Sequence, residues 1–280
     1  IYLRRPVNLS KISKPNIERV GCGKMGSALL RGWLTEGLDP NEITVIDPNP
    51  SDWLIKQTVR LNKTLPINPS IVLIAVKPQM MPDVVPKLKK LGNSKNLFIS
   101  IAAGTSISYF ERILGNQTSI VRAMPNTPAS IGKGITAIIS NDYVSDVELK
   151  ATEKLLSSVG KIVFLDSEEQ MDAVTAVSGS GPAYVFHLIE ALADAGQSNG
   201  LNAELSMTLA KATVVGAGLL AETSDEDPAS LRINVTSPGG TTAAALKILM
   251  NKDTGFHPLL SKAVEAASNR SKELRSSEDG

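Results

Sequence analysis

The sequence predicts an α/β protein with a doubly wound, mostly parallel sheet followed by an all-helical part. Short apolar runs alternate with helical patterns through roughly the first 165 residues, and this alternation is typical of parallel sheets covered by helices on both faces. After Ser167 the pattern is helical only. Two glycine-rich turns, at residues 21–26 and 237–242, each precede a helical pattern near opposite ends of the chain.

Length and composition are those of a globular protein large enough for two domains. The chain has 280 residues, of which 42% are apolar and 20% charged. Cys22 is its only cysteine, and it has only two histidines. A disulfide framework and a zinc cluster are therefore excluded, and no metal is expected. No uninterrupted apolar run reaches the roughly 18 residues of a membrane span, so we expect a cytoplasmic protein without a membrane partner.

The charge is divided unequally between the two parts. Residues 1–160 carry 8 more basic than acidic side chains, whereas residues 161–280 carry 7 more acidic ones. A basic half suits an anionic cofactor. Nucleic acid is not expected, because the lysines are scattered and only 4% of the residues are aromatic. Residues 1–16 are expected to be a disordered N-terminal extension, with a targeting segment as the alternative.

The elements of the first part follow from the apolar runs. Expected strands are Ile43–Ile46, Ile71–Val76, Leu97–Ile101, Ser119–Ala123, Thr136–Ile139 and Lys161–Leu165, with helices at Met25–Glu36 and Val147–Ser158. A first strand is expected at residues 17–20. Its charged pair, Glu18 and Arg19, is unusual for a buried central strand, so either the pair lies at the strand edge or this segment has diverged.

The pattern Gly21-x-Gly23-x-x-Gly26 suits a dinucleotide. Its glycines permit a tight turn, close approach to a pyrophosphate and packing of the following helix. Asp47 ends the next strand, where a carboxylate binds the ribose hydroxyls of NAD and repels the 2′-phosphate of NADP. The alternative for Asp47 is turn formation in Asp-Pro-Asn-Pro. Lys24 is either a phosphate ligand or a solvated lysine.

Other strand ends supply further candidates, because open α/β sheets bind ligands at the carboxyl ends of their strands. Residues 75–78 and 102–104 follow two strands, and their small side chains would admit the nicotinamide ribose; plain turns are the alternative. Asn126 would hold an amide of the cofactor or substrate, or cap a turn. Asn62 would reach the adenosine end of the cofactor, or would be an ordinary loop asparagine without a ligand.

The helical part is expected to form homo-oligomers. Leu209–Ala221 is apolar nearly all round, and a helix without a polar face must be enclosed. About 110 residues cannot easily enclose it, so a second copy of the chain is expected to do so. Helices are also expected at Tyr184–Ala195, after the glycine-rich segment Ser178–Tyr184, and at Pro258–Leu274.

The segment Ser237-Pro238-Gly239-Gly240-Thr241-Thr242 precedes the helical run Ala243–Leu249. Its backbone N–H groups and the helix dipole would hold a small anion such as a carboxylate. The alternative is a simple capping turn. An acid site together with a dinucleotide site suggests a reductase.

These motifs, with Ala-Val-Lys-Pro-Gln, Arg-Ala-Met-Pro-Asn-Thr-Pro and Ser-Gly-Ser-Gly-Pro-Ala-Tyr, resemble those of the pyrroline-5-carboxylate reductases from about residue 17 to residue 275. The resemblance implies a Rossmann domain at 17–166 and a helical substrate and dimerisation domain at 167–276. It also implies reduction of 1-pyrroline-5-carboxylate to L-proline by NAD(P)H, the last step of proline biosynthesis. Many relatives have Ser at the position of Asp47, and that Ser favours NADPH. The carboxylate of this chain is therefore expected to favour NADH.

The resemblance also assigns residues to the two ligands. The implied cofactor residues are Gly21, Cys22, Gly23, Lys24, Met25, Gly26, Asp47, Asn62, Ala75, Val76, Lys77, Pro78, Ala102, Ala103 and Gly104. The implied substrate residues are Asp225, Asn234, Val235, Gly239, Gly240, Thr241 and Thr242, in part from a partner subunit. The amides of 239–242 would anchor the substrate carboxylate. The Thr242 hydroxyl would serve catalysis by hydrogen-bonding the ring nitrogen.

Three alternatives stay open. A β-hydroxyacid dehydrogenase would share the two-domain plan but needs a lysine on the first helix of the second domain, and the helix from Pro182 has none before Lys211. A reductase of a related cyclic imine acid differs only in ring size. A non-catalytic dinucleotide-binding regulator would have lost the loop at Ser237–Thr242.

Overall fold

The computed structural model describes residues 17–62 and 69–279. They form two compact units: the first ends at Ser180 and resumes at Ala267, and the second is Gly181–Ala266. The second unit is thus an insertion into the first, and each is described by itself. The expected extension at 1–16 lies outside the described residues, and the domain bounds 17–166 and 167–276 stay a prediction.

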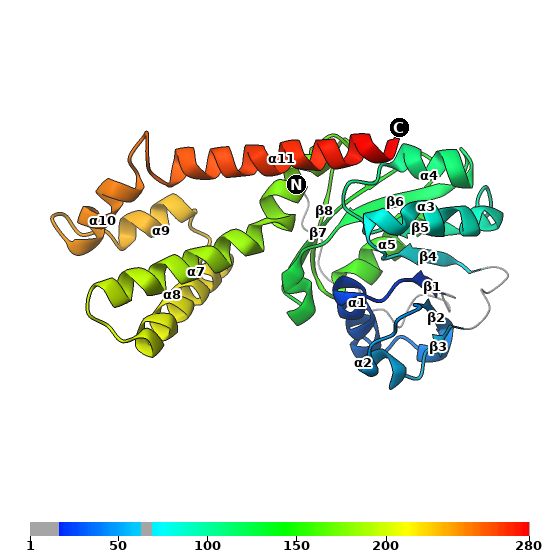
Figure 1. The fold of residues 1–280 in the computed structure, drawn as a ribbon, viewed down its shortest axis with the longest axis horizontal. Helices are drawn as coiled ribbons and strands as arrows, with labels where there is room; N and C mark the ends of the chain where they lie inside the picture. The colour runs from blue at the N-terminus through cyan, green and yellow to red at the C-terminus, as the bar shows by residue number, and fades with distance from the viewer. Residues whose placement is uncertain (1–16, 63–68, 280) are drawn as a thin grey trace. The chain divides into compact units, whose positions relative to one another are not determined.

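Within the described residues, the first unit contains an 8-stranded sheet of order β3-β2-β1-β4-β5-β6-β7-β8. Its strands are β1 (Ile17–Val20), β2 (Ile43–Ile46), β3 (Arg60–Leu61), β4 (Ile71–Ile74), β5 (Leu97–Ser100), β6 (Ser119–Met124), β7 (Gly134–Ser140) and β8 (Gly160–Phe164). The chain builds outward from β1 to β3 and then crosses to β4 on the other side of β1 (Figure 1). This is Rossmann-type topology, so the predicted fold class is confirmed.

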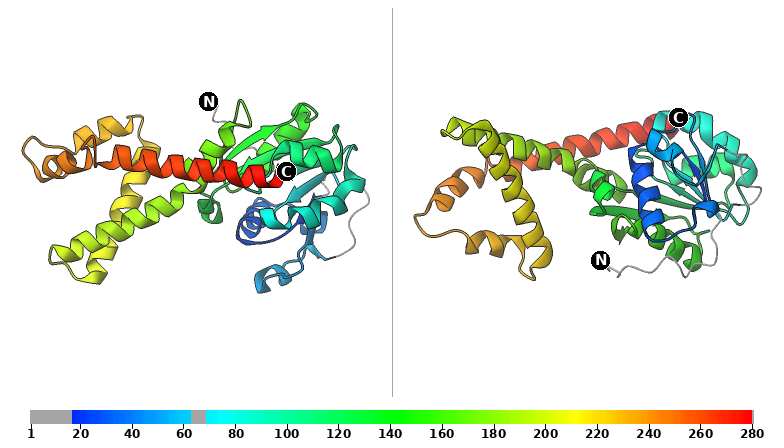
Figure 2. Two further views of the ribbon diagram at one scale, coloured as in Figure 1. Left: turned by 45° about the horizontal axis from the view of Figure 1, so that its top comes forward. Right: turned by 90° about the horizontal axis from the view of Figure 1, so that it is seen from below.

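Helices cover both faces of this sheet, as Figures 1 and 2 show. They are α1 (Lys24–Thr35), α2 (Asp52–Ile55), α3 (Met81–Val84), α4 (Ile107–Leu114), α5 (Asp146–Ser157) and α6 (Gln170–Val174). Short turns of helix are η2 (Pro40–Glu42), η3 (Pro78–Met80), η4 (Val85–Leu91), η5 (Thr127–Ile131) and the π-helical η6 (Thr175–Gly179).

Side-chain alternation along the strands produces two cores. Ile71 and Leu73 of β4 pack with α1 and α5, whereas Val72 and Ile74 of the same strand pack with α3 and α4. All four β4 residues are buried, because a parallel strand covered on both faces has no solvent side. In the first core Trp33 is fully buried, and its indole N–H donates to the Leu155 carbonyl at 2.8 Å.

The charged pair of β1 lies inside the ladder. Glu18 and Arg19 are each in register with residues of both β2 and β4. The alternative that places them at the strand edge is therefore wrong. Backbone pairing is indifferent to side-chain charge, and the flanking Ile17 and Val20 are buried on the two faces and anchor the strand.

The connection between β6 and β7 reverses the chain. β6 and β7 are antiparallel, whereas every other neighbouring pair is parallel. Only η5 and a left-handed turn at Gly132 (φ 70°) separate them. So short a connection lacks the dozen or more residues that a parallel crossover needs.

The second unit is helical throughout its described elements. It contains α7 (Gly181–Ser198), α8 (Ala203–Thr223), α9 (Pro228–Asn234), α10 (Thr241–Leu249) and the start of α11 (Phe256–Asp279). α7 and α8 form a hairpin and pack side by side (Figure 1). Their contact is built from small side chains: Ala193 and Ala210 are buried, and a Cβ at Gly196 would lie 3.0 Å from Ser206 Oγ.

Part of the surface of α8 consists of apolar side chains that the other described residues do not cover. Val215, Leu219 and Leu220 are 58%, 49% and 54% exposed. By length and composition alone, α8 is the one helix of the described residues that also suits a membrane span, although its mean hydropathy over 18 residues is only 1.2. An exposed apolar face of this kind needs a cover, either lipid or another protein chain.

Candidate functional site

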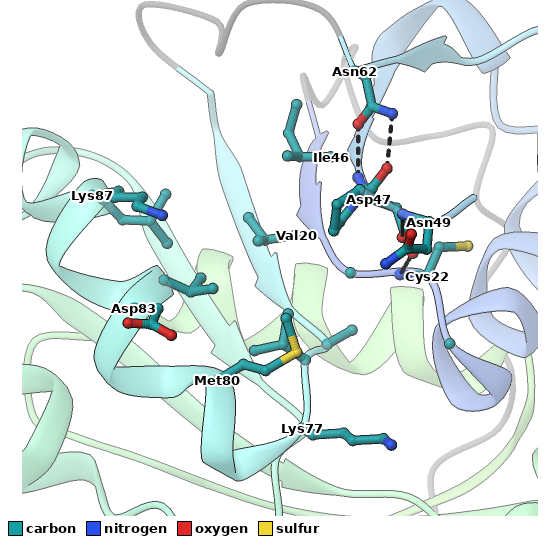
Figure 3. A pocket seen from close by; sticks show the side chains of 17 residues that line it. Val20, Cys22, Ile46, Asp47, Asn49, Asn62, Lys77, Met80, Asp83 and Lys87 are labelled. Atoms are coloured by element: carbon teal, nitrogen blue, oxygen red, sulfur yellow. Dashed lines mark hydrogen bonds between the residues drawn. The ribbon is translucent and has the colours of Figure 1, made fainter.

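A pocket of about 800 Å³ opens at the carboxyl ends of β1, β2 and β4 (Figure 3). This is the edge where doubly wound sheets bind ligands, and the volume suits a cofactor. Predicted residues that line it are Gly21, Cys22, Gly23, Asp47, Asn62, Ala75, Val76 and Lys77. Eight positions from four separate segments of the sequence are thus brought together by the sheet order.

The glycine turn joins β1 to α1 and has different requirements at its first two glycines. Gly21 has φ 89°, and a Cβ there would lie 2.8 Å from both Ala75 O and Val76 Cγ1. Gly23 is exposed and caps α1, and a Cβ there would meet nothing within 4 Å. Among residues 17–62 and 69–279 no side chain caps the first turn of α1, so its N–H groups and dipole are available to an anion.

These two glycines give a paired prediction. Gly21→Ala is expected to lower the free energy of unfolding by about 2 kcal/mol or more, because of its positive φ and the blocked Cβ. Gly23→Ala is expected to leave the midpoint of thermal unfolding unchanged but to weaken NADH binding about 10-fold, since its methyl group would enter the space that a pyrophosphate requires. Differential scanning fluorimetry and a fluorescence titration with NADH measure the two effects. Normal NADH affinity in Gly23→Ala would place the pyrophosphate elsewhere.

Asp47 lies at the end of β2 and links two loops of the pocket. Its Oδ2 accepts the Cys22 N–H at 2.6 Å, and its Oδ1 accepts the Asn49 N–H at 2.9 Å. The carboxylate is therefore fixed beside the glycine turn. A carboxylate has about four acceptor sites, so both oxygens retain capacity for a ribose hydroxyl.

Asn62 holds the backbone of Asp47. Its Oδ1 accepts the Asp47 N–H at 2.8 Å, and its Nδ2 donates to the Asp47 carbonyl at 2.7 Å (Figure 3). Asn62 itself has φ 49°, a left-handed conformation that asparagine tolerates better than most residues. Sequence reasoning assigned this side chain to the adenosine. In the structure it lines the same pocket, but both ends of its amide are bound to Asp47.

One side of the pocket was missed by the sequence analysis. Met80, Asp83, Val84, Lys87 and Leu88 line it from η3, α3 and η4, opposite Asp47 and Asn62 in Figure 3. Their spacing is helical, and this was the available signal. Two prolines, Pro82 and Pro86, obscured it by breaking the segment into short helical pieces.

The remaining predicted cofactor residues lie beside the pocket without lining it. Lys24, Met25 and Gly26 form the first turn of α1, and Pro78 begins η3. Ala102, Ala103 and Gly104 follow β5, which pairs with β4. Asn126 is used structurally: its Nδ2 donates to the Ser178 carbonyl, and its Oδ1 accepts the Ile135 N–H, which favours the turn alternative.

A second candidate anion site lies in the helical unit. Gly240 caps α10 without a side-chain hydrogen bond, and Gly239 has φ 71°. The first N–H groups of α10 are therefore directed away from the helix and uncapped. The first two residues of α10 are Thr241, which is exposed, and Thr242, which is half-buried. Within the described residues, no hydrogen bond of the Thr242 hydroxyl to another residue is seen.

The other predicted substrate residues flank α9. Asn234 and Val235 end it and are exposed, and Asn234 Nδ2 donates to Glu226 Oε2 at 2.6 Å. Asp225 is exposed before it. Asp227 caps the start of α9, and its carboxylate accepts the N–H groups of Ser230 and Ala229. These bonds, that of Ser230 foremost, lower the pKa of Asp227. Among the described residues, no group of three or more His, Cys, Asp or Glu could hold a metal ion.

Two family models match the chain. The model for pyrroline-5-carboxylate reductase dimerisation matches residues 168–274. The model described as NADP oxidoreductase coenzyme F420-dependent matches residues 17–104. The second match spans the glycine turn, Asp47, Asn62 and the loop at 102–104.

Similar proteins align over nearly the whole chain. A pyrroline-5-carboxylate reductase of Pseudomonas aeruginosa is 39% identical over 270 residues, which cover 94% of this chain and 98% of that protein. One from Synechocystis is 41% identical over 262 residues, covering 91% and 96%.

Solved structures are also similar to this chain over nearly its whole length. A pyrroline-5-carboxylate reductase of Coxiella burnetii has a TM-score of 0.87 at 36% identity, covering 94% of this chain and 99% of that one. A pyrroline carboxylate reductase of Plasmodium falciparum with NADP bound has a TM-score of 0.81 at 34% identity, covering 93% and 98%.

Proposed function

The chain belongs to the pyrroline-5-carboxylate reductase family, and we propose that it reduces the C=N bond of 1-pyrroline-5-carboxylate with a hydride from NAD(P)H, giving L-proline in the last step of proline biosynthesis. The observation that carries the proposal is the alignment at 36–41% identity over nearly the whole chain. Steady-state kinetics with the imine and either NADH or NADPH test it. Oxidation of the dinucleotide must depend on the imine, and L-proline must be the product.

The residues of the pocket fit a dinucleotide. The uncapped first turn of α1 and the open space at Gly23 would receive the pyrophosphate, and Asp47 would bind the adenosine ribose. Lys77 and Lys87 add positive charge to the lining. The cofactor, when bound, supplies the hydride. The chain itself binds and orients the two reactants.

The proposal includes a preference for NADH. The Asp47 carboxylate is held in place by the Cys22 N–H and, through its backbone, by Asn62. It cannot easily turn away from a ligand at the ribose. A 2′-phosphate would bring a second negative charge against it, which favours the dinucleotide without that phosphate.

The substrate is proposed to bind at the start of α10. The N–H groups around Gly239–Thr242 would hold its carboxylate, with Asp225, Asn234 and Val235 nearby in the same unit. The Thr242 hydroxyl would hydrogen-bond the ring nitrogen. A protonated imine is already a strong hydride acceptor, so the protein need supply no covalent nucleophile.

Homo-oligomerisation follows from the dimerisation model and accounts for the apolar face of α8. We propose that this face, which consists of Val215, Leu219 and Leu220, is part of the contact with a second copy. Separately, we propose that the enzyme is cytoplasmic. A contact between two copies at this face would enclose the apolar side chains of α8 that are exposed in one copy.

Leu219→Glu is expected to raise the dissociation constant between subunits by at least about 100-fold, because each contact would bury an unpaired carboxylate. Light scattering coupled to size exclusion measures the mass. Ile131→Asp is the matched control, since Ile131 is 76% exposed and lies on η5 of the first unit. An unchanged mass for Leu219→Glu would move the interface away from this face.

A further inference from the structure

The loop between β5 and α4 is held from outside the cofactor pocket by two groups of side chains. Ala102–Gly104 begin this loop, and Ile107 is the first residue of α4. One group contacts the end of the loop and the other covers its glycine. Both involve residues just before or within α6, a helix that does not line the pocket.

Glu168 holds the end of the loop. Its Oε1 accepts the Ile107 N–H at 2.9 Å and a hydrogen bond from Arg122 Nη1 at 2.7 Å. Ile107 N–H is one of the first N–H groups of α4, which have no partner within the helix. Arg122 is 1% exposed, so the ion pair with Glu168 is largely shielded from water and its geometry is well defined.

The last turns of α11 cover the start of the loop. Gly104 has φ 79°, and a Cβ there would lie 3.5 Å from Leu274 Cβ and 3.8 Å from the backbone N of Arg275. A methyl group at Gly104 would therefore make van der Waals contact with α11, so α11 covers this part of the loop. A displacement of these turns would therefore change the packing around Gly104.

Asp172 fixes those turns. It is 1% exposed on α6; its Oδ1 accepts the Ser271 hydroxyl at 2.7 Å, and Arg275 Nη2 lies 3.1 Å from its Oδ2. Within the described residues Oδ2 has no well-oriented hydrogen bond, and the Arg275 guanidinium supplies it with a compensating positive charge. We call Asp172, Ser271 and Arg275 the Asp172 brace.

The brace also joins the two points where the chain leaves and re-enters the first unit. The chain leaves through η6, directly after α6, and returns at Ala267, on the same helix as Ser271. Asp172 and Ser271 are separated by 99 positions in sequence. A buried carboxylate that joins such distant segments requires both partners to be in place.

Resting on the proposed function, we propose that Asp172 and Arg275 are positioning residues for hydride transfer: through the last turns of α11 they hold the Ala102–Gly104 loop, which in this proposal would contact the nicotinamide end of the cofactor. Neither side chain lines the cofactor pocket. Their effect is on where the loop backbone lies, so they act on turnover rather than on affinity for the dinucleotide.

Arg275→Ala tests this inference, with Arg270→Ala as the matched control. Arg270 lies on the same helix, and in the described part of the chain its ion pair is with exposed Glu273, one turn away. We expect Arg275→Ala to lower kcat about 10-fold or more, because small misplacements of reacting groups are costly, with the KM for NADH within about 2-fold of wild type. Arg275→Lys should recover part of the loss, and Arg270→Ala should match wild type.

Hydrogen exchange of the peptide covering residues 100–107 supplies a readout that needs no substrate. Faster exchange in Arg275→Ala, but not in Arg270→Ala, is expected. Unchanged exchange, or faster exchange with normal kcat, would overturn the inference. A double variant Asp172→Ala/Arg275→Ala should lose no more kcat than Asp172→Ala alone, and additive losses would contradict a shared brace. A wild-type chain that fails to reduce the imine would refute the proposed function, while the exchange data would still decide whether the brace holds the loop.

Discussion

Thr242→Ala is expected to lower kcat for imine reduction about 100-fold while leaving the affinity for NADH nearly intact. A hydroxyl that accepts a hydrogen bond from the protonated ring nitrogen would stabilise the imine cation, and a hydrogen bond to a charged group is worth about 1.5–3 kcal/mol, or roughly 10- to 150-fold in rate. Thr242 is half-buried in the first turn of α10, in the unit that does not contain the cofactor pocket. Stopped-flow measurement of NADH oxidation under single-turnover conditions isolates the affected step.

Thr242→Ser is the control for this prediction, because it keeps the hydroxyl and removes only a methyl group. It should retain most of the wild-type rate. A Thr242→Ala enzyme that turns over normally would remove this side chain from the mechanism. A Thr242→Ser enzyme as slow as Thr242→Ala would indicate that packing, rather than the hydroxyl, is what matters.

Asp47→Asn is expected to shift the ratio of kcat/KM for NADH over NADPH about 10- to 100-fold toward NADPH. Asparagine keeps an acceptor for the Cys22 N–H but removes the negative charge. Like charges in direct contact cost several kcal/mol when buried, and the partial exposure of Asp47 reduces that figure. Kinetics with each dinucleotide at saturating imine give the ratio.

Asp142→Asn is the matched control, since Asp142 is exposed and lies outside the pocket lining. It changes the net charge equally and should leave the ratio unaltered. A wild-type enzyme that already prefers NADPH would contradict the role assigned to Asp47, as would an Asp47→Asn enzyme with an unchanged ratio.

Much of the first unit could be predicted because its strands are buried on both faces. The uninterrupted apolar run at Ile71–Ile74, and the run at Ile43–Ile46 that only Thr44 interrupts, follow from that burial, and helices between them must cover the sheet. The glycine turn was predictable for a different reason: Gly21 requires a positive φ, and few other residues permit it.

Other features depend on contacts that a linear pattern does not contain. The amide of Asn62 contacts Asp47 because β3 pairs with β2, and β3 is only two residues long. The lining from Met80 to Leu88 was hidden by its prolines. The link from Asp172 to Ser271 joins segments 99 residues apart, and neither residue belongs to a recognisable motif.

The central claim is that hydride passes from the dinucleotide to the C=N carbon on this protein. Mass spectrometry of the product formed from 1-pyrroline-5-carboxylate and NADH carrying deuterium at both C4 positions tests it directly, whichever face of the ring is used. We expect L-proline with a single deuterium at C5, in amounts equal to the NAD⁺ formed. Unlabelled proline, or oxidation of the dinucleotide without proline, would contradict it.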